Sequence, residues 1–173
     1  MDLKSGYPYW AIRNGLIQAF PPLETDLKCD VLIAGGGITG ALIADELSAH
    51  GHQVALVEQR DIGWGSTSAS TALLQYEIDT HLIDLAHQYG EDNAALAYTA
   101  CAEALTLLKD VTSGLRGVDF RQMDSLYLAS KARHVPVLQA EGEARRRHGL
   151  GATWLDRDAL RERIGIEGSG ALH

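Results

Sequence analysis

Cysteine is scarce in this chain of 173 residues, and its scarcity limits the chemistry that the chain can support. The two cysteines, Cys29 and Cys101, are far apart and form no CxxC pair. The chain therefore has no disulfide framework. We expect a reducing, cytoplasmic setting.

Long apolar runs and an excess of positive charge are missing as well. No apolar stretch approaches the ~20 residues that a membrane-spanning helix needs, and the polar N-terminus lacks the pattern of a secretory signal. There are 15 basic residues and 23 acidic ones, which gives a formal net charge of −8. Since a nucleic-acid clamp needs a basic face, we expect neither a membrane nor a nucleic-acid partner.

Metal-ligand spacing is absent too. No cluster of histidines, cysteines and carboxylates has the spacing of a ligand set, so we expect no metal site. The basic run Arg145–His148 lies on a predicted helix that also carries Glu141 and Glu143. Mixed charge of this kind is typical of a solvated helix face.

Glycine is abundant, with 18 residues, and its placement carries most of the information. Residues 30–34 (DVLIA) predict a short strand buried on both faces, as in a parallel sheet, and this run ends at a triple glycine. Residues 38–50 have a helical period, with Gly51 as the stop. Residues 53–58 (QVALVE) predict a second buried strand. Together these segments predict a right-handed βαβ unit.

The turn between the first strand and the helix carries a glycine pattern, Gly35-x-Gly37-x-x-Gly40. Gly35 permits the tight turn, Gly37 lets a pyrophosphate approach the backbone, and Gly40 allows close packing of the helix on the sheet. The amides around Ile38 and Thr39 then point at the anion from the positive end of the helix dipole. No Lys-Ser or Lys-Thr follows, which excludes a nucleoside-triphosphate P-loop.

Two further features suit a dinucleotide. Glu58 ends the second strand. Its distance in sequence from the glycine motif is close to the ~20 residues after which this fold has an acidic residue that binds a ribose hydroxyl. The loop that follows is rich in small hydroxyl residues, including Ser66 and Thr67, which offer donors to a second stretch of pyrophosphate. A plain NAD-binding unit does not need this second loop. The pattern therefore favours FAD over an NAD-dependent dehydrogenase or a methyltransferase.

The rest of the chain is predicted to be mostly helical. Thr80 caps a short helix that runs to Tyr89, and a longer helix runs from Glu91 to about Thr112. Residues 123–130 predict a strand, residues 131–148 a helix and residues 153–155 a brief extended piece. Asp156 is predicted to cap a last short helix that ends near Gly165. The longer helix has apolar residues at core spacing: Leu96, Ala100, Ala104, Leu107 and Val111.

Two segments of the sequence resemble a known family. The runs VLIAGGGITGALIADELSAHGHQVALVEQ and GWGSTSASTALL are similar to the N-terminus of FAD-dependent oxidoreductases of the D-amino-acid oxidase superfamily, which includes glycine, sarcosine and γ-glutamylputrescine oxidases. The YPYW arm and the PPLETD segment are most similar to the γ-glutamylputrescine oxidase branch. Residues 75–173 match only in a loose helical layout.

The resemblance implies roles for individual residues. It places the amides of Ile38 and Thr39 on the pyrophosphate and Glu58 on a ribose. Family members often have glycine at the position of Ala72. The further positions implied to contact the cofactor are Gln59 near the adenosine, Arg60 at phosphate or ribose (or a plain surface arginine), Ser66 and Thr67 in the second loop, and Thr71, Ala72 and Leu73 beside the flavin ring.

The resemblance also implies an α/β fold that is incomplete relative to the family: a Rossmann-like FAD-binding βαβ unit, then a mostly helical segment and the start of a substrate domain. We divide the chain into an arm at 1–28, the βαβ unit and second flavin loop at 29–80, and a partial substrate domain at 81–173. The arm is predicted to be irregular. Either its aromatic residues Tyr7, Tyr9 and Trp10 pack it onto a domain, or it is a tail that orders only in the full protein.

The implied activity is oxidation of an amine or amino acid by hydride transfer to flavin. No His or Cys lies between Arg60 and Thr80, so FAD is expected to be held without a covalent bond in this region. The substrate-binding residues of the family lie mostly beyond the matched part, and no catalytic residue is assigned. Three alternatives stay open for the chain. It is the FAD-binding part of an amine or amino-acid oxidoreductase, an FAD-binding module that a partner chain completes, or an inactive remnant. Exposed sheet edges would favour self-association or pairing with another chain.

Overall fold

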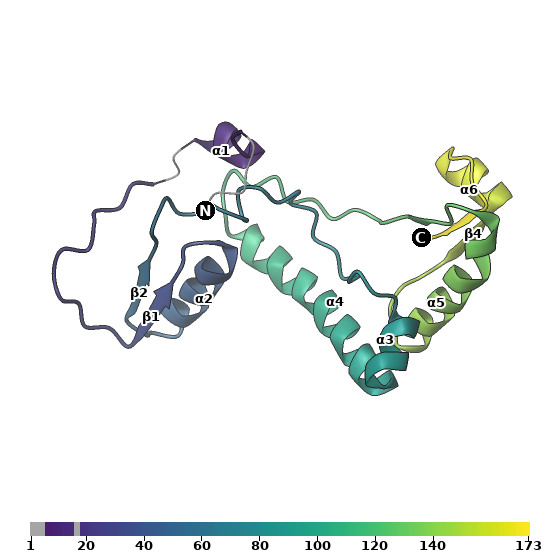
Figure 1. Ribbon diagram of the computed structural model, residues 1–173, viewed down its shortest axis with the longest axis horizontal. Helices are drawn as coiled ribbons and strands as arrows, with labels where there is room; N and C mark the ends of the chain where they lie inside the picture. The colour runs from purple at the N-terminus through teal and green to yellow at the C-terminus, as the bar shows by residue number, and fades with distance from the viewer. Residues whose placement is uncertain (1–5, 16–17) are drawn as a thin grey trace. The chain divides into compact units, whose positions relative to one another are not determined.

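The computed structural model describes residues 6–15 and 18–173. The chain divides into two compact units, the first ending at Leu73 and the second running from Leu74 to His173 (Figure 1). Each unit has its own sheet, and each is described by itself.

The first unit is built on the predicted βαβ element. Strands β1 (Val31–Ala34) and β2 (Val54–Val57) pair in parallel, with Val31 opposite Val54, and helix α2 (Ile38–Ala49) connects them. The helix ends at Ala49 with His50 as its C-cap, and Gly51 follows in the left-handed region with φ +83°. Gly51 thus provides the local stop of the helix, and the predicted strand–helix–strand order is confirmed.

Burial of the strands differs from the prediction. Ile33 and Ala55 are each 8% exposed, but Leu32 is 63% exposed. The prediction of a strand buried on both faces is therefore wrong for β1 in this chain. A sheet of two strands buries the face that carries Ile33, where the residue packs near Gly40 of α2, and leaves the Leu32 side open.

The N-terminal arm is more ordered than predicted. Helix α1 (Tyr9–Asn14) forms in the segment predicted to be irregular. The Trp10 indole Nε1–H donates to the carbonyl of Ser70 at 2.9 Å, and the rings of Tyr7 and Trp64 meet edge to face with centroids 6.4 Å apart. These contacts confirm that the arm packs onto its domain. The part of the prediction that falls on residues 1–5 and 16–17 lies outside the described residues.

The second unit combines helices with a small antiparallel sheet. The sheet has the order β3 (Tyr127–Leu128), β5 (Gly170–Leu172), β4 (Trp154–Asp156). The helices are α3 (Leu82–Tyr89), α4 (Glu91–Ser113), α5 (Val135–Arg147) with a 3-10 turn before it (Ala132–His134), and α6 (Arg157–Ile164).

Most of these elements follow their sequence signals. The Asp156 carboxylate accepts from the Ala159 amide at 2.9 Å, and Gly165 ends α6 with φ +78°, as predicted. The central strand β5 was not predicted, because three residues that include a glycine carry no strand pattern. A Cβ on Gly142 would lie 2.6 Å from Leu172, so α5 packs closely on β5.

Helix α3 begins differently from the prediction. Its N-cap is His81 rather than Thr80, and no side chain at the cap accepts a hydrogen bond. The carboxylate of Glu141 on α5 serves instead, because it accepts from the amides of Leu82 (2.9 Å) and Ile83 (3.1 Å). A carboxylate at this position accepts hydrogen bonds from two first-turn amides that have no partner within the helix. Its negative charge is also stabilised by the positive end of the helix dipole.

Two residues of the helix face that was predicted to be solvated are buried. Glu141 is 0% exposed and Arg145 is 3% exposed, and the Arg145 Nε donates to Glu141 Oε1 at 2.8 Å. The Arg145 guanidinium also lies over the rings of Tyr76 and Tyr98, 5.6 and 5.4 Å from their centroids. Burial alone would lower the pKa of Arg145, but hydrogen bonds to Glu141 and Tyr76 outweigh it and hold the pKa above its usual range. The solvated-face prediction is therefore wrong for this pair.

Helix α4 buries a face that the sequence did not indicate. Its buried residues are Ala94 and Tyr98, which join the core around Leu82, Ala144 and Leu150. The prediction of a core stripe is wrong, since all five of its residues are exposed. This exposed stripe consists of Leu96, Ala100, Ala104, Leu107 and Val111.

Across residues 6–15 and 18–173, no helix is both long and apolar enough to cross a membrane.

Candidate dinucleotide-binding site

The candidate site lies in the first unit, where β1 turns into α2. Gly35 has φ +113°, a conformation that side-chain-bearing residues rarely adopt, and its amide donates to the Val57 carbonyl at 2.8 Å. A Cβ on Gly40 would collide with the Gly35 carbonyl oxygen. The helix therefore packs closely against the turn, as predicted for Gly40.

The second loop meets this turn at Thr67. The Ile38 amide, the first of α2, donates to the Thr67 hydroxyl oxygen at 3.0 Å. A Cβ on Gly37 would lie 3.1 Å from the same oxygen. Ile38 and Thr39 are exposed, so the start of α2 is open to an incoming anion.

Glu58 lies at the carboxyl end of β2 and contacts the same turn. Its Oε2 accepts from the Gly36 amide at 2.7 Å and its Oε1 accepts from the Arg60 amide at 3.0 Å. The hydrogen bond from Gly36, followed by that from Arg60, lowers the pKa of Glu58. The carboxylate is therefore ionised at neutral pH, and an ionised carboxylate has lone pairs left for hydroxyl donors.

Gly36 is a residue that the motif-based reasoning missed. It is buried, and a Cβ there would collide with the Ile62 side chain and lie 3.3 Å from the Cβ of Glu58. Its amide holds Glu58, and its carbonyl accepts from Gly63 at 2.8 Å. The sequence does contain a signal for this role. The turn has three consecutive glycines, whereas the motif requires glycine only at Gly35 and Gly37 within that stretch.

The predicted flavin-ring segment has one unusual backbone position. Ala72 has φ +55°, and among the described residues it is the one non-glycine in the left-handed region. Its amide donates to the Ser70 hydroxyl oxygen at 3.0 Å. The conformation accounts physically for glycine at this position in the resembling family, since glycine adopts it without a Cβ penalty.

The structure brings together some of the predicted site residues and not others. Those at the turn or in contact with it are Gly35, Gly37, Ile38, Thr39, Gly40, Glu58 and Thr67. The Arg60 side chain lies beside Gly65, whose Cβ would be 3.7 Å from Nη2. Gln59, Ser66, Thr71, Ala72 and Leu73 are exposed, and the hydrogen bonds described for this unit do not tie their side chains to the turn.

Within the part of the chain that the structure describes, no group of three His, Cys, Asp or Glu side chains is arranged to hold a metal ion.

Comparison with known proteins places this geometry in context. The model of the DAO family, described as FAD dependent oxidoreductase, matches residues 30–173. The match covers both the turn with its second loop and the whole second unit.

Two curated relatives align with large parts of the chain. A protein of Bacillus subtilis (strain 168) named as a Rieske 2Fe-2S iron-sulfur protein, YhfW, is 33% identical over 124 residues, which cover 72% of this chain and 23% of that protein. The γ-glutamylputrescine oxidoreductase of Escherichia coli (strain K12) is 26% identical over 169 residues, which cover 95% of this chain and 39% of that protein. The chain thus spans about two fifths or less of these relatives' length.

A solved structure shares the fold. The L-proline dehydrogenase from P. horikoshii superposes with a TM-score of 0.67 at 21% identity, covering 86% of this chain and 37% of that one.

Proposed function

Because the chain belongs to the family of FAD-dependent oxidoreductases, we propose that it forms the N-terminal, FAD-binding portion of an enzyme that oxidises an amine or an amino acid. The observation that carries the proposal is the junction at the start of α2, where the glycine turn, Glu58 and Thr67 meet. The similarity to a γ-glutamylputrescine oxidoreductase over nearly the whole chain supports the amine as substrate.

The residues at the turn fit the pyrophosphate and ribose of a dinucleotide. The amides of Ile38 and Thr39 are at the open N-terminus of a 12-residue helix, where backbone donors and the helix dipole favour an anion. The hydroxyl of Thr67 accepts from Ile38 through its oxygen, so its own proton is available to a phosphate oxygen. Ionised Glu58 would accept from the ribose hydroxyls.

Bound flavin would supply the redox chemistry by accepting a hydride from the carbon next to the substrate nitrogen. The chain's own contribution is to bind and orient the cofactor. The absence of His and Cys between Arg60 and Thr80 supports a cofactor held without a covalent bond in this region.

The first test is the visible absorption spectrum of the purified chain, followed by acid release and chromatography of any pigment. We expect a yellow protein that releases intact FAD. A folded, colourless protein that refuses added FAD but binds NAD would contradict the proposal.

A second candidate is an FAD-binding module that is completed by a partner chain. The observation in its favour is the open side of the first unit's sheet, where Leu32 is 63% exposed.

One measurement distinguishes the two candidates. The FAD-loaded chain is mixed with amines and amino acids under anaerobic conditions, and loss of visible absorbance in the absence of any other protein supports the enzyme portion and rejects the module.

A further inference from the structure

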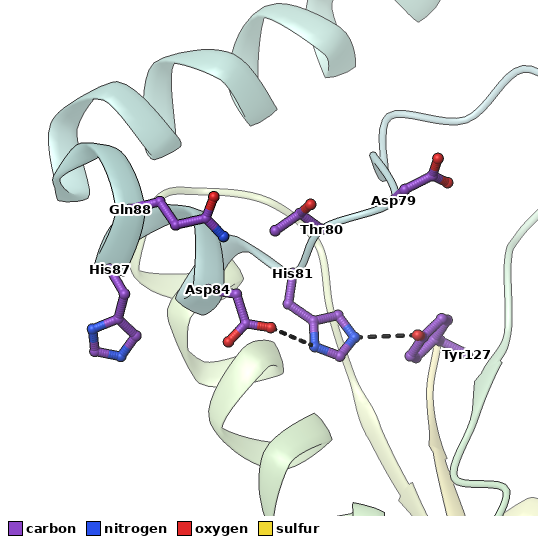
Figure 2. Close-up of a pocket in the computed structure, with 7 residues that line it drawn as sticks. All are labelled: Asp79, Thr80, His81, Asp84, His87, Gln88 and Tyr127. Carbon is purple, nitrogen blue, oxygen red and sulfur yellow. Dashed lines mark hydrogen bonds and ion pairs between the residues drawn. The ribbon is translucent and has the colours of Figure 1, made fainter.

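A polar hollow of about 490 Å³ lies within the second unit (Figure 2). Its wall comes from the segment before α3, from α3 itself and from β3. The residues that line it are Asp79, Thr80, His81, Asp84, His87, Gln88 and Tyr127. Its volume is within the range of small-molecule pockets.

One wall of the hollow is held in place by buried groups. The Tyr98 hydroxyl, from a residue that is 0% exposed, donates to the Thr80 carbonyl at 2.7 Å. On the other side of His81, Glu141 accepts from the amides of Leu82 and Ile83. His81 therefore lies between two backbone positions that are tied to the core, although the segment before α3 has no regular secondary structure.

The imidazole of His81 is oriented from both sides. Its Nε2 lies 3.2 Å from the Tyr127 hydroxyl and its Nδ1 lies 3.7 Å from Asp84 Oδ2. Figure 2 shows both contacts as dashed lines. The His81 and Tyr127 rings also meet edge to face, with centroids 5.4 Å apart. Two exposed carboxylates alone would be ordinary surface charge. An imidazole held between a carboxylate and a phenol, on a wall that is hydrogen-bonded to the core, is a preorganised arrangement.

The charge of the lining selects the kind of ligand. Asp79 and Asp84 contribute two carboxylates, and none of the described residues that line the hollow is Lys or Arg. Tyr127 adds an aromatic face, which attracts cations. A metal ion is disfavoured, because among the described residues no three potential ligands converge. An ammonium group suits this set, since its N–H donors match the carboxylates and its charge matches both the carboxylates and the ring.

We propose that the hollow bounded by His81, Asp84 and Tyr127 binds a small organic cation through its ammonium group. The ammonium is positioned by Asp84 and Asp79, and the alkyl part lies against Tyr127. This site belongs to the second unit alone, and it does not depend on the binding of FAD.

The test uses the full 173-residue chain without added flavin, in buffer with 150 mM salt, so that the attraction of a cation to the net negative charge is screened. Butylamine is titrated while the side-chain NMR resonances of His81 and Tyr127 are followed. Butan-1-ol and butyrate serve as neutral and anionic probes of the same size. We expect saturable shifts with butylamine and none with the other two.

Matched variants locate the site. Asp84→Asn should weaken butylamine binding on the order of fivefold, whereas Asp110→Asn, which removes the same charge from exposed α4, should leave it unchanged. Tyr127→Phe keeps the ring but removes the hydroxyl beside His81, and a loss of about twofold to threefold is expected. Circular dichroism checks that each variant is folded. Equal binding of butyrate or butan-1-ol, or equal weakening by Asp110→Asn, would overturn the proposal.

Discussion

At the scale of single residues, Ala72 adopts a left-handed backbone conformation, with φ +55°, that its Cβ makes energetically unfavourable. Ala72→Gly should raise the free energy of unfolding by up to ~1 kcal/mol, because relief of the Cβ penalty outweighs the added freedom of the unfolded chain. Ala69→Gly, in the same loop but outside the positive-φ region, should be neutral or destabilising. Urea denaturation of the two variants measures the difference, and a shift of the same sign in both would contradict the argument.

The hydrogen bonds to Glu58 lead to a prediction about how the stability of the protein depends on pH. Since its folded pKa is lowered from 4.5, chiefly by the Gly36 amide, it stabilises the fold above pH 4.5, and this contribution disappears as the pH falls through the folded value. Wild-type protein should therefore be more stable than Glu58→Gln at pH 7, and the gap should narrow as the solution is acidified below pH 4.5. Asp45→Asn, at an exposed position of α2, is the matched control. Urea midpoints measured at several pH values report the gap, and a gap that widens in acid would rule out this account.

At the scale of elements, Glu141 joins two helices. Glu141→Ala leaves the buried guanidinium of Arg145 without its closest partner and the amides of Leu82 and Ile83 without an acceptor. We expect a loss of about 3–5 kcal/mol in the free energy of unfolding. Glu143→Ala, on an exposed position of the same helix, should change it by less than about 0.5 kcal/mol. Chemical denaturation followed by helical circular dichroism compares them, and equal effects would show that the pair does not link the helices.

The elements also show what the sequence could predict. Helices α2 and α6 were predicted with their stops because Gly51, Asp156 and Gly165 act within one turn of the helix that they end. The cap of α3 was not predictable, because its acceptor comes from Glu141 on another helix. The burial of Arg145 was missed for the same reason, since a charge pattern does not reveal which side of a helix meets a neighbour.

The same distinction applies to the candidate site. The glycine turn and Glu58 were identified because a strand, a helix and a second strand close in sequence force them together. The supporting role of Gly36 and the hollow around His81 depend on residues brought together from separate segments, for which no local pattern exists. The cofactor-binding roles of all the predicted site residues stay predictions, and for Gln59, Ser66, Thr71, Ala72 and Leu73 no side-chain hydrogen bond to the turn among the described residues supports them.

At the scale of the whole molecule, the exposed stripe of α4 changes the expected effect of its leucines on the free energy of unfolding. If Leu107 were in a core, Leu107→Ala would cost about 2–5 kcal/mol. Since Leu107 is 65% exposed, we expect less than about 0.5 kcal/mol at low protein concentration. Leu82→Ala, at a position 2% exposed, should show the full core penalty. A large loss of stability in dilute Leu107→Ala, measured by urea denaturation, would mean that the stripe is buried.

An exposed apolar stripe also bears on self-association, which the sequence analysis expected. Leu96→Gln combined with Leu107→Gln removes two large apolar side chains from the stripe, and neither position belongs to the candidate sites. Sedimentation of wild-type protein should show a mass that rises with concentration, and the double variant should show a smaller rise. An identical concentration dependence in both would exclude the stripe as the contact.

The position of β5 in the chain has a consequence for biosynthesis. Residues 170–172 form the central strand between β3 and β4, and both of those strands precede it in the sequence. During translation, β3 and β4 have no partner until the ribosome has released these residues, whereas the first unit's sheet is complete once β2 has emerged. The two halves of the chain should therefore become protease-resistant at different times during synthesis, the first unit well before the second.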